Sequence, residues 1–347
     1  MSKYLITPFD VLIFGDGKPF NAGEQHNREG DFFLNPVPFV GAFNKNTNLK
    51  TGLRFLSFYD EEKENFLFPV PLDIGFEEDG EIINSLLKKS DKDFISSDEL
   101  EFFVEFDTDK KMKVGGRYIN TQGLKSYLLG KKLDKKDIYN LFGEIIEKEI
   151  RTGIEIDRTT RTTKEKKLYF QPFIRFHEKI KFFVEFKQEI KKDFLTIGGE
   201  SKSVNILPFN TDPLKELNVK EIKEKISQTK YFKIILLTPT NYPPKLDGAE
   251  LIAQLTGKPI TFSGWYNIYK ENNKKSGSFP TRLFKLLPEG SVFYYRLVDE
   301  NKLDEIFNNH WLKPNFYIHE LPYFDKANPI GFGLTIIGTV KTEGKNE

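Results

Sequence analysis

Glycine next to a cation or an aromatic ring is the pattern in this 347-residue sequence that could do chemistry. It occurs in four turn-like segments: Gly15-Asp16-Gly17-Lys18-Pro19-Phe20, Gly198-Gly199-Glu200-Ser201-Lys202, Ser263-Gly264-Trp265 and Gly331-Phe332-Gly333. Glycine permits close backbone approach, so exposed amides can grip a phosphate while a nearby Lys or Arg neutralises it. One such turn alone is typical of an ordinary tight turn, but the set favours binding of an RNA backbone.

Patterns typical of the common enzyme classes are absent. The four histidines, His26, His177, His310 and His319, have no metal-ligand spacing, and no pair of carboxylates stands out for acid–base work. No dinucleotide fingerprint or phosphate-binding P-loop is present. The sequence contains no cysteine, which excludes disulfides, thiolate metal sites and cysteine nucleophiles. The residues therefore indicate no enzyme of the common classes, and we expect no metal and no cofactor.

The net charge of +1 hides a strong segregation of charge along the chain. Residues 60–107 contain sixteen acidic residues and four lysines, a net of −12, whereas residues 110–136 contain eight lysines and one arginine against Asp134, a net of +8. A second basic stretch, 151–167, includes Arg151, Arg158 and Arg161. We predict two separate surfaces, a basic one available to RNA and an acidic one facing solvent or a basic protein partner.

Strands and helices are predicted without regular β-α-β alternation, which favours an α+β fold. Strands are expected at 4–14, 100–106, 231–238, 293–298 and 331–340, with two more within 168–186 on either side of 177–179. Helices are expected within 39–59 and over 137–150, 219–226 and 303–308. The helix over 137–150 follows from apolar residues at helical spacing after a capping Asp134.

The pentapeptide Phe-Phe-Val-Glu-Phe occurs twice, at 102–106 and at 182–186. Its aromatic centre is similar to that of an RNA-recognition strand, in which ring faces stack on bases. The Lys/Arg-Gly-Phe/Tyr-Gly/Ala start of that motif is missing from both copies, so two ordinary buried strands are the preferred interpretation.

The start of the chain shows no signal peptide, and no apolar run approaches the ~20 residues that span a bilayer. A cytoplasmic protein without membrane association is expected. A change in composition at 208–217 predicts two domains, 1–212 and 213–347, with the acidic 60–107 and basic 110–136 segments as insertions in the first.

Ordered motifs along the chain resemble the third subunit of the Cmr complex, the type III-B CRISPR–Cas RNA-guided interference complex, within the RAMP superfamily. They are Pro8-Phe9-Asp10 with Phe14 to Phe20, Pro36 to Ala42, Arg151 to Asp157, Leu168-Tyr169, Ile197 to Glu200, Phe262 to Trp265, Pro280-Thr281-Arg282, Pro288 to Val292 and Gly331-Phe332-Gly333. Each motif alone is weak, but the ordered set spans almost the whole chain.

The resemblance implies two ferredoxin-like (RRM-like) RAMP domains with insertions and a C-terminal glycine-rich loop. It implies a non-catalytic subunit, acting in antiviral defence, that binds the 5′ tag of the crRNA and bridges the large polymerase-like subunit and the RAMP backbone subunits. The expected phosphate contacts are Lys18, Arg151, Arg158, Arg161, Lys202 and Arg282. Gly198, Gly199, Gly331 and Gly333 would allow close backbone approach, and Phe332 would pack on a base or ribose, although core packing is the preferred role for its ring.

Two alternatives remain open at this point. The chain could be a metal-independent RAMP endoribonuclease that processes crRNA, with His26 as general base. It could also be the equivalent tag-binding subunit of a type III-A complex, although the segments at 151–157 and 263–265 favour the Cmr version.

Overall fold

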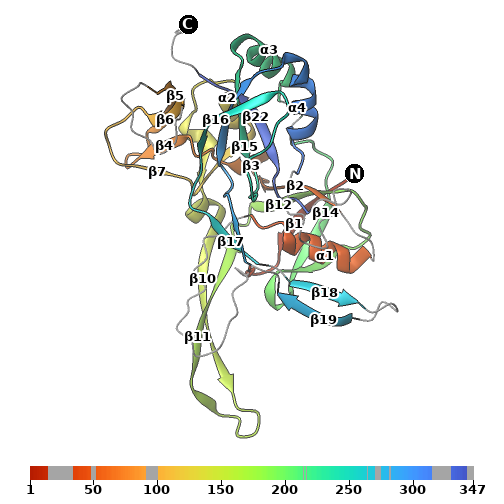
Figure 1. Cartoon of the computed structure of the whole chain (residues 1–347). Helices are drawn as coiled ribbons and strands as arrows, with labels where there is room; N and C mark the ends of the chain where they lie inside the picture. Colours follow the sequence, from red (N-terminus) through yellow and green to blue (C-terminus); the bar gives the residue numbers. More distant parts are fainter. Residues whose placement is uncertain are drawn as a thin grey trace.

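The computed structural model describes residues 1–14, 34–47, 52–90, 101–213, 215, 217–263, 265–269, 275–280, 283–314 and 330–341. Its body contains two antiparallel sheets and a smaller third one, and a long two-stranded hairpin extends away from them (Figure 1). The fold is therefore mixed α/β and rich in antiparallel strands, as the sequence predicted. None of the described helices is long and apolar enough to cross a membrane.

The N-terminal part of the chain forms an eight-stranded sheet in the order β13-β14-β1-β12-β2-β3-β8-β9. Its strands are β1 (Ser2–Pro8), β2 (Leu53–Asp60), β3 (Asn65–Pro69), β8 (Arg117–Asn120), β9 (Ile138–Asn140), β12 (Ile180–Phe186), β13 (Phe194–Ile197) and β14 (Lys202–Pro208). Helix α1 (Val37–Thr47) covers one face, where Phe39 lies 4.8 Å from Phe182 and Phe43 lies 3.7 Å from Phe186 between ring centroids. Aromatic packing therefore closes this face.

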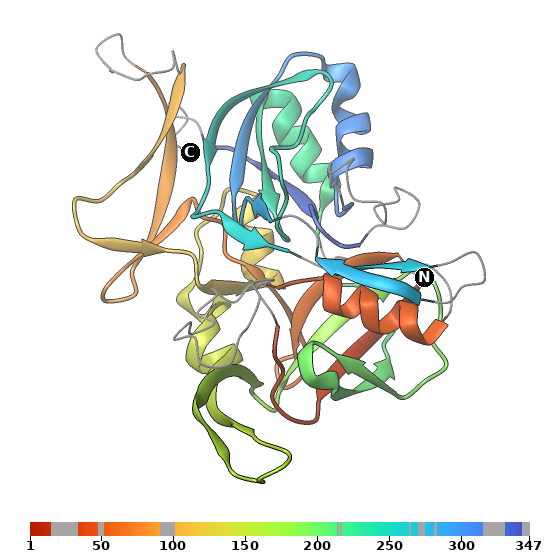
Figure 2. The same ribbon diagram turned by 60° about the horizontal axis from the view of Figure 1, so that its bottom comes forward.

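The C-terminal part forms a four-stranded sheet in the order β16-β21-β15-β22. Its strands are β15 (Tyr231–Leu236), β16 (Ala249–Leu255), β21 (Val292–Leu297) and β22 (Thr335–Thr339). Helices α3 (Val219–Thr229) and α4 (Leu303–His310) lie side by side against it, and α2 (Thr121–Leu128) packs near β22 (Figures 1 and 2). Apolar side chains of all three helices join the hydrophobic cluster that contains β15 and β21.

The acidic and the first basic segments share a third sheet, in the order β6-β5-β4-β7. Its strands are β4 (Ile74–Glu77), β5 (Ile82–Lys89), β6 (Phe102–Phe106) and β7 (Met112–Val114). Phe76 of the acidic segment pairs with Lys113 of the basic one, and Lys110 Nζ lies 2.7 Å from Glu77 Oε2. The prediction of two separate charged surfaces is therefore wrong here, because strand pairing brings the opposite charges together and neutralises part of each.

Three two-stranded ladders complete the described structure. They are β10 (Ile146–Ile156) with β11 (Thr163–Phe176), β17 (Ile260–Phe262) with β20 (Phe284–Leu286), and β18 (Trp265–Tyr269) with β19 (Lys275–Pro280). Short helical turns lie at Lys135–Asp137, Leu141–Ile145, Gly199–Ser201 and Glu300–Lys302.

The predicted helix over 137–150 is wrong. Asp134 does cap a turn, since its side chain accepts a hydrogen bond from Lys136 N at 3.1 Å, but that turn is only three residues long. Gly143, with φ of 99°, interrupts any continuous helix, and the chain from Ile146 onward pairs with β11. The β-branched residues and the alternation in 146–156 suit a strand, and long-range pairing overrode the short helical spacing.

The other predicted elements occur, with shifted ends. The strands around 177–179 and the helix-to-strand passage at 219–238 are confirmed, as are the strand at 293–298 and the helix at 303–308. The first strand is shorter than predicted and ends at Pro8, beyond which Leu12 only bridges to Ile174. The last strand begins at Thr335, because the residues around Gly331 form a turn.

Candidate nucleic-acid interface

The hairpin of β10 and β11 carries three of the predicted RNA contacts: Arg151 in β10, and Arg158 and Arg161 at the tip. Pairing of Arg151 with Gln171 and of Glu149 with Phe173 gives it one charged face. The opposite face is largely apolar. Its side chains are buried at the base of the hairpin and exposed further from the sheets, where Ile150 is 69% and Phe170 48% exposed. Figure 1 shows that the hairpin reaches well beyond the sheets.

The tip of the hairpin is a turn organised by Asp157. Its carboxylate accepts hydrogen bonds from Thr159 N at 2.8 Å and Thr160 N at 3.2 Å, and its carbonyl accepts one from Arg161 N at 2.8 Å. Arg158 and Arg161 are exposed, and neither side chain forms an ion pair within the part of the chain that the structure describes. The turn therefore presents two positive charges, those of Arg158 and Arg161, that no described carboxylate neutralises through an ion pair.

At the base of the hairpin, Arg151 is already bound to carboxylates. Its Nε donates to Glu149 Oε1 at 2.7 Å and its Nη2 to Asp10 Oδ2 at 3.1 Å. Arg175 shares both partners, with Nε donating to Glu149 Oε2 at 2.7 Å and Nη2 to Asp10 Oδ1 at 3.4 Å. These ion pairs thus link β10 and β11 to Asp10, in the segment that follows β1.

The hydrogen bonds at this base keep both carboxyl groups ionised. The backbone N–H of Val11 and the side chain of Arg151 lower the pKa of Asp10. Hydrogen bonds from Arg151 and then Arg175 lower the pKa of Glu149. At neutral pH the base is therefore an electrically balanced ion-pair network, and a phosphate must share or displace a carboxylate to reach Arg151.

The structure brings four of the predicted site residues to one place around the ring of Phe173. The Arg151 guanidinium and the Lys202 ammonium each lie 5.1 Å from the centre of that ring. Gly199 N donates to the Ile13 carbonyl at 2.9 Å, and Ile13 packs with Phe173. Gly198 has φ of 75°, and a Cβ there would lie 2.5 Å from the same carbonyl, so glycine is required by this close approach. We call Asp10, Glu149, Arg151, Phe173, Arg175 and Lys202 the Phe173 cluster.

The glycine-rich turn at 331–333 lies elsewhere, between the two large sheets. The Gly331 carbonyl accepts a hydrogen bond from Thr238 Oγ1 at 2.7 Å, and a Cβ on Gly331 would come within 2.8 Å of Leu53. Gly333 N donates to the Pro239 carbonyl at 2.8 Å. The Phe332 ring is fully buried and meets Phe262 edge-on at 5.2 Å. In this structure the turn serves packing, and Phe332 is a core side chain.

Two predicted contacts, Lys18 and Arg282, lie outside the described residues, as does His26 of the endoribonuclease alternative. The sequence reasoning missed Arg175, Phe173, Asp10 and Glu149. The alternation of charges in 147–151 was the available signal, because residues two apart in a strand share a face. It was hidden by the mistaken helix over 137–150.

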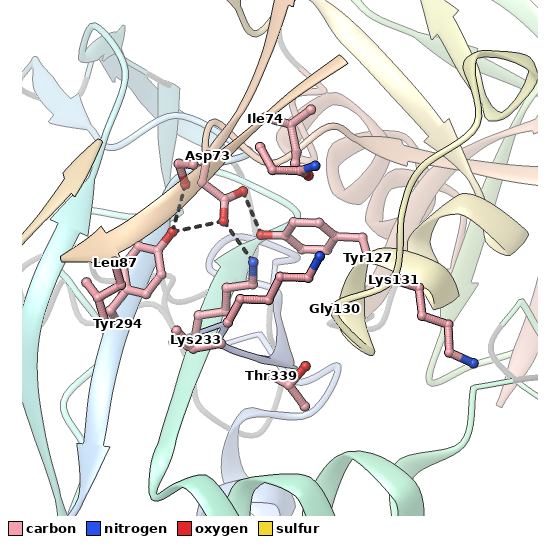
Figure 3. A pocket seen from close by; sticks show the side chains of 13 residues that line it. Asp73, Ile74, Leu87, Tyr127, Gly130, Lys131, Lys233, Tyr294 and Thr339 are labelled. Atoms are coloured by element: carbon pink, nitrogen blue, oxygen red, sulfur yellow. Dashed lines mark hydrogen bonds and ion pairs between the residues drawn. The ribbon is translucent and has the colours of Figure 1, made fainter. Parts of the chain in front are cut away.

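A buried ion pair beside a small cavity could suggest chemistry, but its carboxylate, Asp73, already accepts from three donors. Lys233 Nζ lies 2.8 Å from Asp73 Oδ2, and Tyr127 and Tyr294 donate their hydroxyls to the same carboxylate at 2.7 and 2.9 Å (Figure 3). The Lys233 ammonium also lies 3.8 Å from the centre of the Tyr127 ring. Burial lowers the pKa of Lys233, and the adjoining hollow of about 30 Å³ has room for little more than water. This group joins β15, β21 and α2 to the segment before β4.

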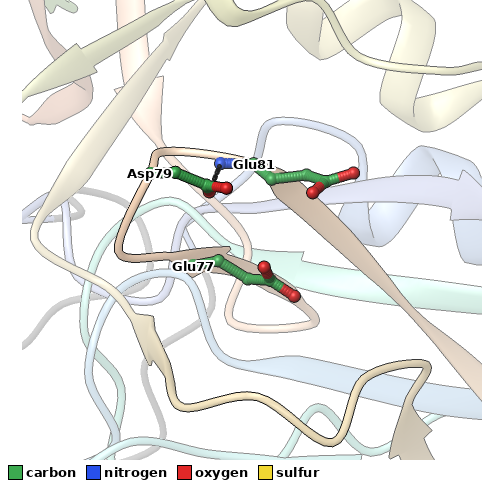
Figure 4. Close-up of side chains that lie close together, drawn as sticks. All are labelled: Glu77, Asp79 and Glu81. Atoms are coloured by element: carbon green, nitrogen blue, oxygen red, sulfur yellow. Dashed lines mark hydrogen bonds between the residues drawn. The ribbon is translucent and has the colours of Figure 1, made fainter.

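Glu77, Asp79 and Glu81 are the carboxylates that come close enough together to suggest a cation site among the described residues (Figure 4). Glu77 is occupied by Lys110 and by Thr108 Oγ1, which donates to it at 2.7 Å. Asp79 accepts a hydrogen bond from Glu81 N at 2.9 Å. Lys110 already supplies the positive charge that a cation would bring to Glu77, and we assign no metal site to this turn.

Comparison with known proteins finds a matching protein family and similar solved structures. The sequence model of the family described as CRISPR-associated protein (Cas_Cmr3) matches residues 4–340. A chain in the cryo-EM structure of the Type III-B Cmr-beta bound to cognate target RNA has a TM-score of 0.50 at 16% identity, over 95% of both chains. A second structure of that assembly, with AMPPnP, gives 0.46 at 16% identity over 95% of this chain and 94% of that one. A chain of the Csm3-Csm4 subcomplex of a type III-A interference complex gives 0.32 at 14% identity over 86% and 94%. No curated protein sequence matches.

Proposed function

Because the chain belongs to the Cas_Cmr3 family of CRISPR-associated proteins, we propose that it is a non-catalytic subunit of a type III-B CRISPR RNA-guided effector complex. In this proposal the subunit binds the 5′ tag of the crRNA and bridges the large polymerase-like subunit to the RAMP backbone subunits. The guide sequence is read by base pairing, so the protein needs only to hold the backbone and a few unpaired bases.

The observation that carries the RNA-binding proposal is the convergence of Arg151, Lys202, Gly198 and Gly199, which are far apart in sequence, around Phe173. The proposed phosphate contacts fall into two classes. Arg158 and Arg161 are exposed at the hairpin tip and form no ion pair among the described residues, so they are available without rearrangement. Arg151 and Lys202 are held by carboxylates, which positions them but weakens their attraction for phosphate. Lys18 and Arg282 stay in the proposed set, whereas Gly331 and Gly333 are buried and Gly333 N already donates to the Pro239 carbonyl, so we propose no phosphate contact for them.

The strand orders support the proposed pair of ferredoxin-like RAMP domains, 1–212 and 213–347. In chain order β1, β2, β12 and β14 are strands one to four of the first set. In the sheet they lie in the order four, one, three, two (β14-β1-β12-β2), and α1 connects strands one and two. β15, β16, β21 and β22 are strands one to four of the second set. In the sheet they lie in the order two, three, one, four (β16-β21-β15-β22), which is the first pattern read from the opposite edge, and α4 lies between strands three and four in the chain. Both sets match a split β-α-β arrangement with one crossover helix moved or replaced. The segments from β3 to β11 are then insertions.

The exposed apolar face of the hairpin supports the bridging role. Ile150, Ile154, Ile156 and Phe170 are each about half exposed or more, at 69, 47, 54 and 48%. An extended row of exposed apolar side chains is typical of a surface that is covered in an assembly. We therefore propose that this face contacts a neighbouring subunit.

The RNA-binding proposal is tested with the reconstituted complex by measuring tag affinity as a function of salt. The variant Arg151→Ala/Arg158→Ala should bind more weakly, with a slope of log K against log salt that is shallower by about 0.7 for each phosphate that the variant no longer neutralises. Arg158→Ala alone should account for most of the weakening, because Arg151 is shared with Glu149 and Asp10.

Arg296→Ala is the matched control. Arg296 is similarly exposed and is also ion-paired with two carboxylates, those of Glu101 and Glu250, but it lies on the C-terminal sheet. It should leave both affinity and slope unchanged. An assembled complex in which the Arg151/Arg158 variant retains full affinity and slope would contradict the assignment.

A further inference from the structure

A pair of exposed aromatic rings lies at the β13 edge of the eight-stranded sheet. Phe9, one residue beyond β1, and Phe194, the first residue of β13, are 62 and 60% exposed. The two rings stack on each other, with centroids 5.7 Å apart and planes 30° apart. Each ring is thus held in position by the other while most of its surface remains in water, which is unfavourable unless something else covers it.

The two rings belong to one open face of the sheet. Thr7 of β1 and Phe194 of β13 both pair with Asn205 of β14, and Phe9 N donates to the Ser203 carbonyl at 3.3 Å. Strand alternation puts nine residues of β1, β13 and β14 and their ends on this face: Lys3, Leu5, Thr7, Phe9, Phe194, Thr196, Ser203, Asn205 and Leu207. The opposite face holds Tyr4 and Ile6 and is packed under α1. Towards the middle of the sheet the open face closes, since Leu5 is buried in the core.

The residues around the rings favour a nucleic acid over a protein as the occupant. None of the β1, β13 and β14 positions named for this described face is Asp or Glu, and four carry hydroxyl or amide groups that can bond to base edges. Lys3 lies on the face, directly across from Glu185 of β12, and Lys191 and Lys192 closely precede β13, with Asp193 between them and Phe194. The carboxylate nearest to Phe9 in sequence, Asp10, is held by Arg151 and Arg175. Rings among polar groups and lysines are typical of sheets that stack unpaired bases.

We propose that unpaired RNA bases stack on Phe9 and Phe194 across this open face of β1, β14 and β13. The platform adjoins the Phe173 cluster at one point, since Phe9 is followed by Asp10, which binds Arg151. Lys202 and Ser203 are neighbours in β14 and so point to opposite faces of the sheet. An RNA strand with bases on the rings would therefore reach the cluster on the side of Asp10 and Arg151. The inference rests on the proposed function, since it places part of the RNA that the subunit would hold.

The test uses the reconstituted complex with guide RNAs that carry 5-iodouridine at single positions of the 5′ tag. Irradiation should cross-link one or more positions to the peptides that contain Phe9 or Phe194, identified by mass spectrometry. Phe9→Leu/Phe194→Leu should abolish these cross-links and weaken tag binding by about 5- to 150-fold, the range for the removal of one stacked base. Phe9→Tyr/Phe194→Tyr should restore both, because it restores the rings.

Phe142→Ala is the matched control, since this ring is also exposed, at 45%, but lies away from the open face. Cross-links to other peptides of this chain, with unchanged affinity in the leucine variant, would overturn the platform and leave the proposed RNA binding intact. Absence of any cross-link to this chain in an assembled complex would overturn both. Loss of the leucine variant from the complex, with tag contacts of the remaining chain unchanged, would show that a protein covers this face and would also overturn the inference.

Discussion

The two copies of Phe-Phe-Val-Glu-Phe offer a comparison in which the local sequence is held constant. Both copies form strands, β6 and β12. β12 lies between β1 and β2 in the middle of the eight-stranded sheet, and four of its five repeat residues are buried. β6 is the edge strand of the small third sheet, and only its first residue is buried.

Position in the sheet, rather than sequence, accounts for this difference. A central strand has a partner on each side and a packed layer on each face, whereas an edge strand lacks one partner. Phe182 meets the rings of Phe39 and Phe176 at 4.8 and 4.6 Å, while Phe102 has Tyr231 at 5.9 Å. Neither copy is an open stacking platform. The exposed stacked rings, Phe9 and Phe194, come from segments without any aromatic repeat.

The largest expected effect tests this comparison directly. Phe183→Ala, in the buried copy, should lower the free energy of unfolding by about 3–5 kcal/mol, because it leaves a cavity among Phe55, Phe66 and Leu5. Phe103→Ala, the same position in the edge copy, should cost only about 1 kcal/mol, since Phe103 is half-buried. Urea unfolding of both variants measures the two values. Equal destabilisation would mean that the edge copy is as tightly packed as the central one.

A second effect of similar size concerns the attachment of the third sheet, which contains β6, to the C-terminal sheet. Lys233→Ala should destabilise the protein by about 3–5 kcal/mol, because it leaves the buried carboxylate of Asp73 without its cation. Asp73 precedes β4, so hydrogen exchange should increase in β4, β5 and β6 before it increases in β12. The double variant Lys233→Met/Asp73→Asn should recover part of the stability, because it removes the unpaired charge and keeps an amide oxygen that can accept from the buried hydroxyls of Tyr127 and Tyr294. Exchange that rises equally in β12 would contradict a separate attachment of the third sheet.

The smallest expected effect is the change of folding stability with pH, compared between Glu289, which precedes β21, and the exposed Glu105 of β6. Glu289 accepts hydrogen bonds from Tyr118 Oη at 3.0 Å and from Leu34 N at 3.3 Å, and burial raises its pKa from 4.5 to about 7. The folded state therefore holds this proton more tightly than the unfolded state. Its stabilising effect is complete below about pH 4.5 and is lost as pH rises to about 7, on the order of 3 kcal/mol at most.

Glu289→Gln should flatten the dependence of stability on pH over this window, measured by urea unfolding from about pH 4.5 to about pH 7.5 in steps. Glu105→Gln is the control in the edge copy. Its carboxylate is exposed and lies 2.6 Å from Lys88, so its removal should cost about 0–1 kcal/mol. A wild-type profile that is already flat over the same window would contradict the burial of Glu289.

Prediction from the sequence succeeded for elements whose signals are local and failed where distant partners decide. The helix at 219–226 has a capping Asn218, whose side chain accepts from Glu221 N at 3.3 Å, and an amphipathic pattern within the segment. The segment 137–150 has helical spacing as well, but β11 offers 146–156 a ladder of hydrogen bonds that no local pattern reveals. The same mistake hid the Phe173 cluster, because Glu149 and Arg151 share a face only in a strand.

The sequence by itself determined the family, the α+β class, the absence of cysteine chemistry and the positions of some strands and helices, such as 219–226 and 303–308, because these depend on residue types and near neighbours. The tertiary structure alone decided which charges are compensated. Among the described residues, Arg158 and Arg161 have no carboxylate partner at the hairpin tip, whereas Arg151 is matched by Asp10, which lies 141 residues earlier in the sequence. It also decided which aromatic rings face water, burying Phe182 and Phe332 and exposing Phe9 and Phe194. Charge pairing and ring exposure depend on segments that meet only in the folded chain, and for that reason no window of sequence specifies them.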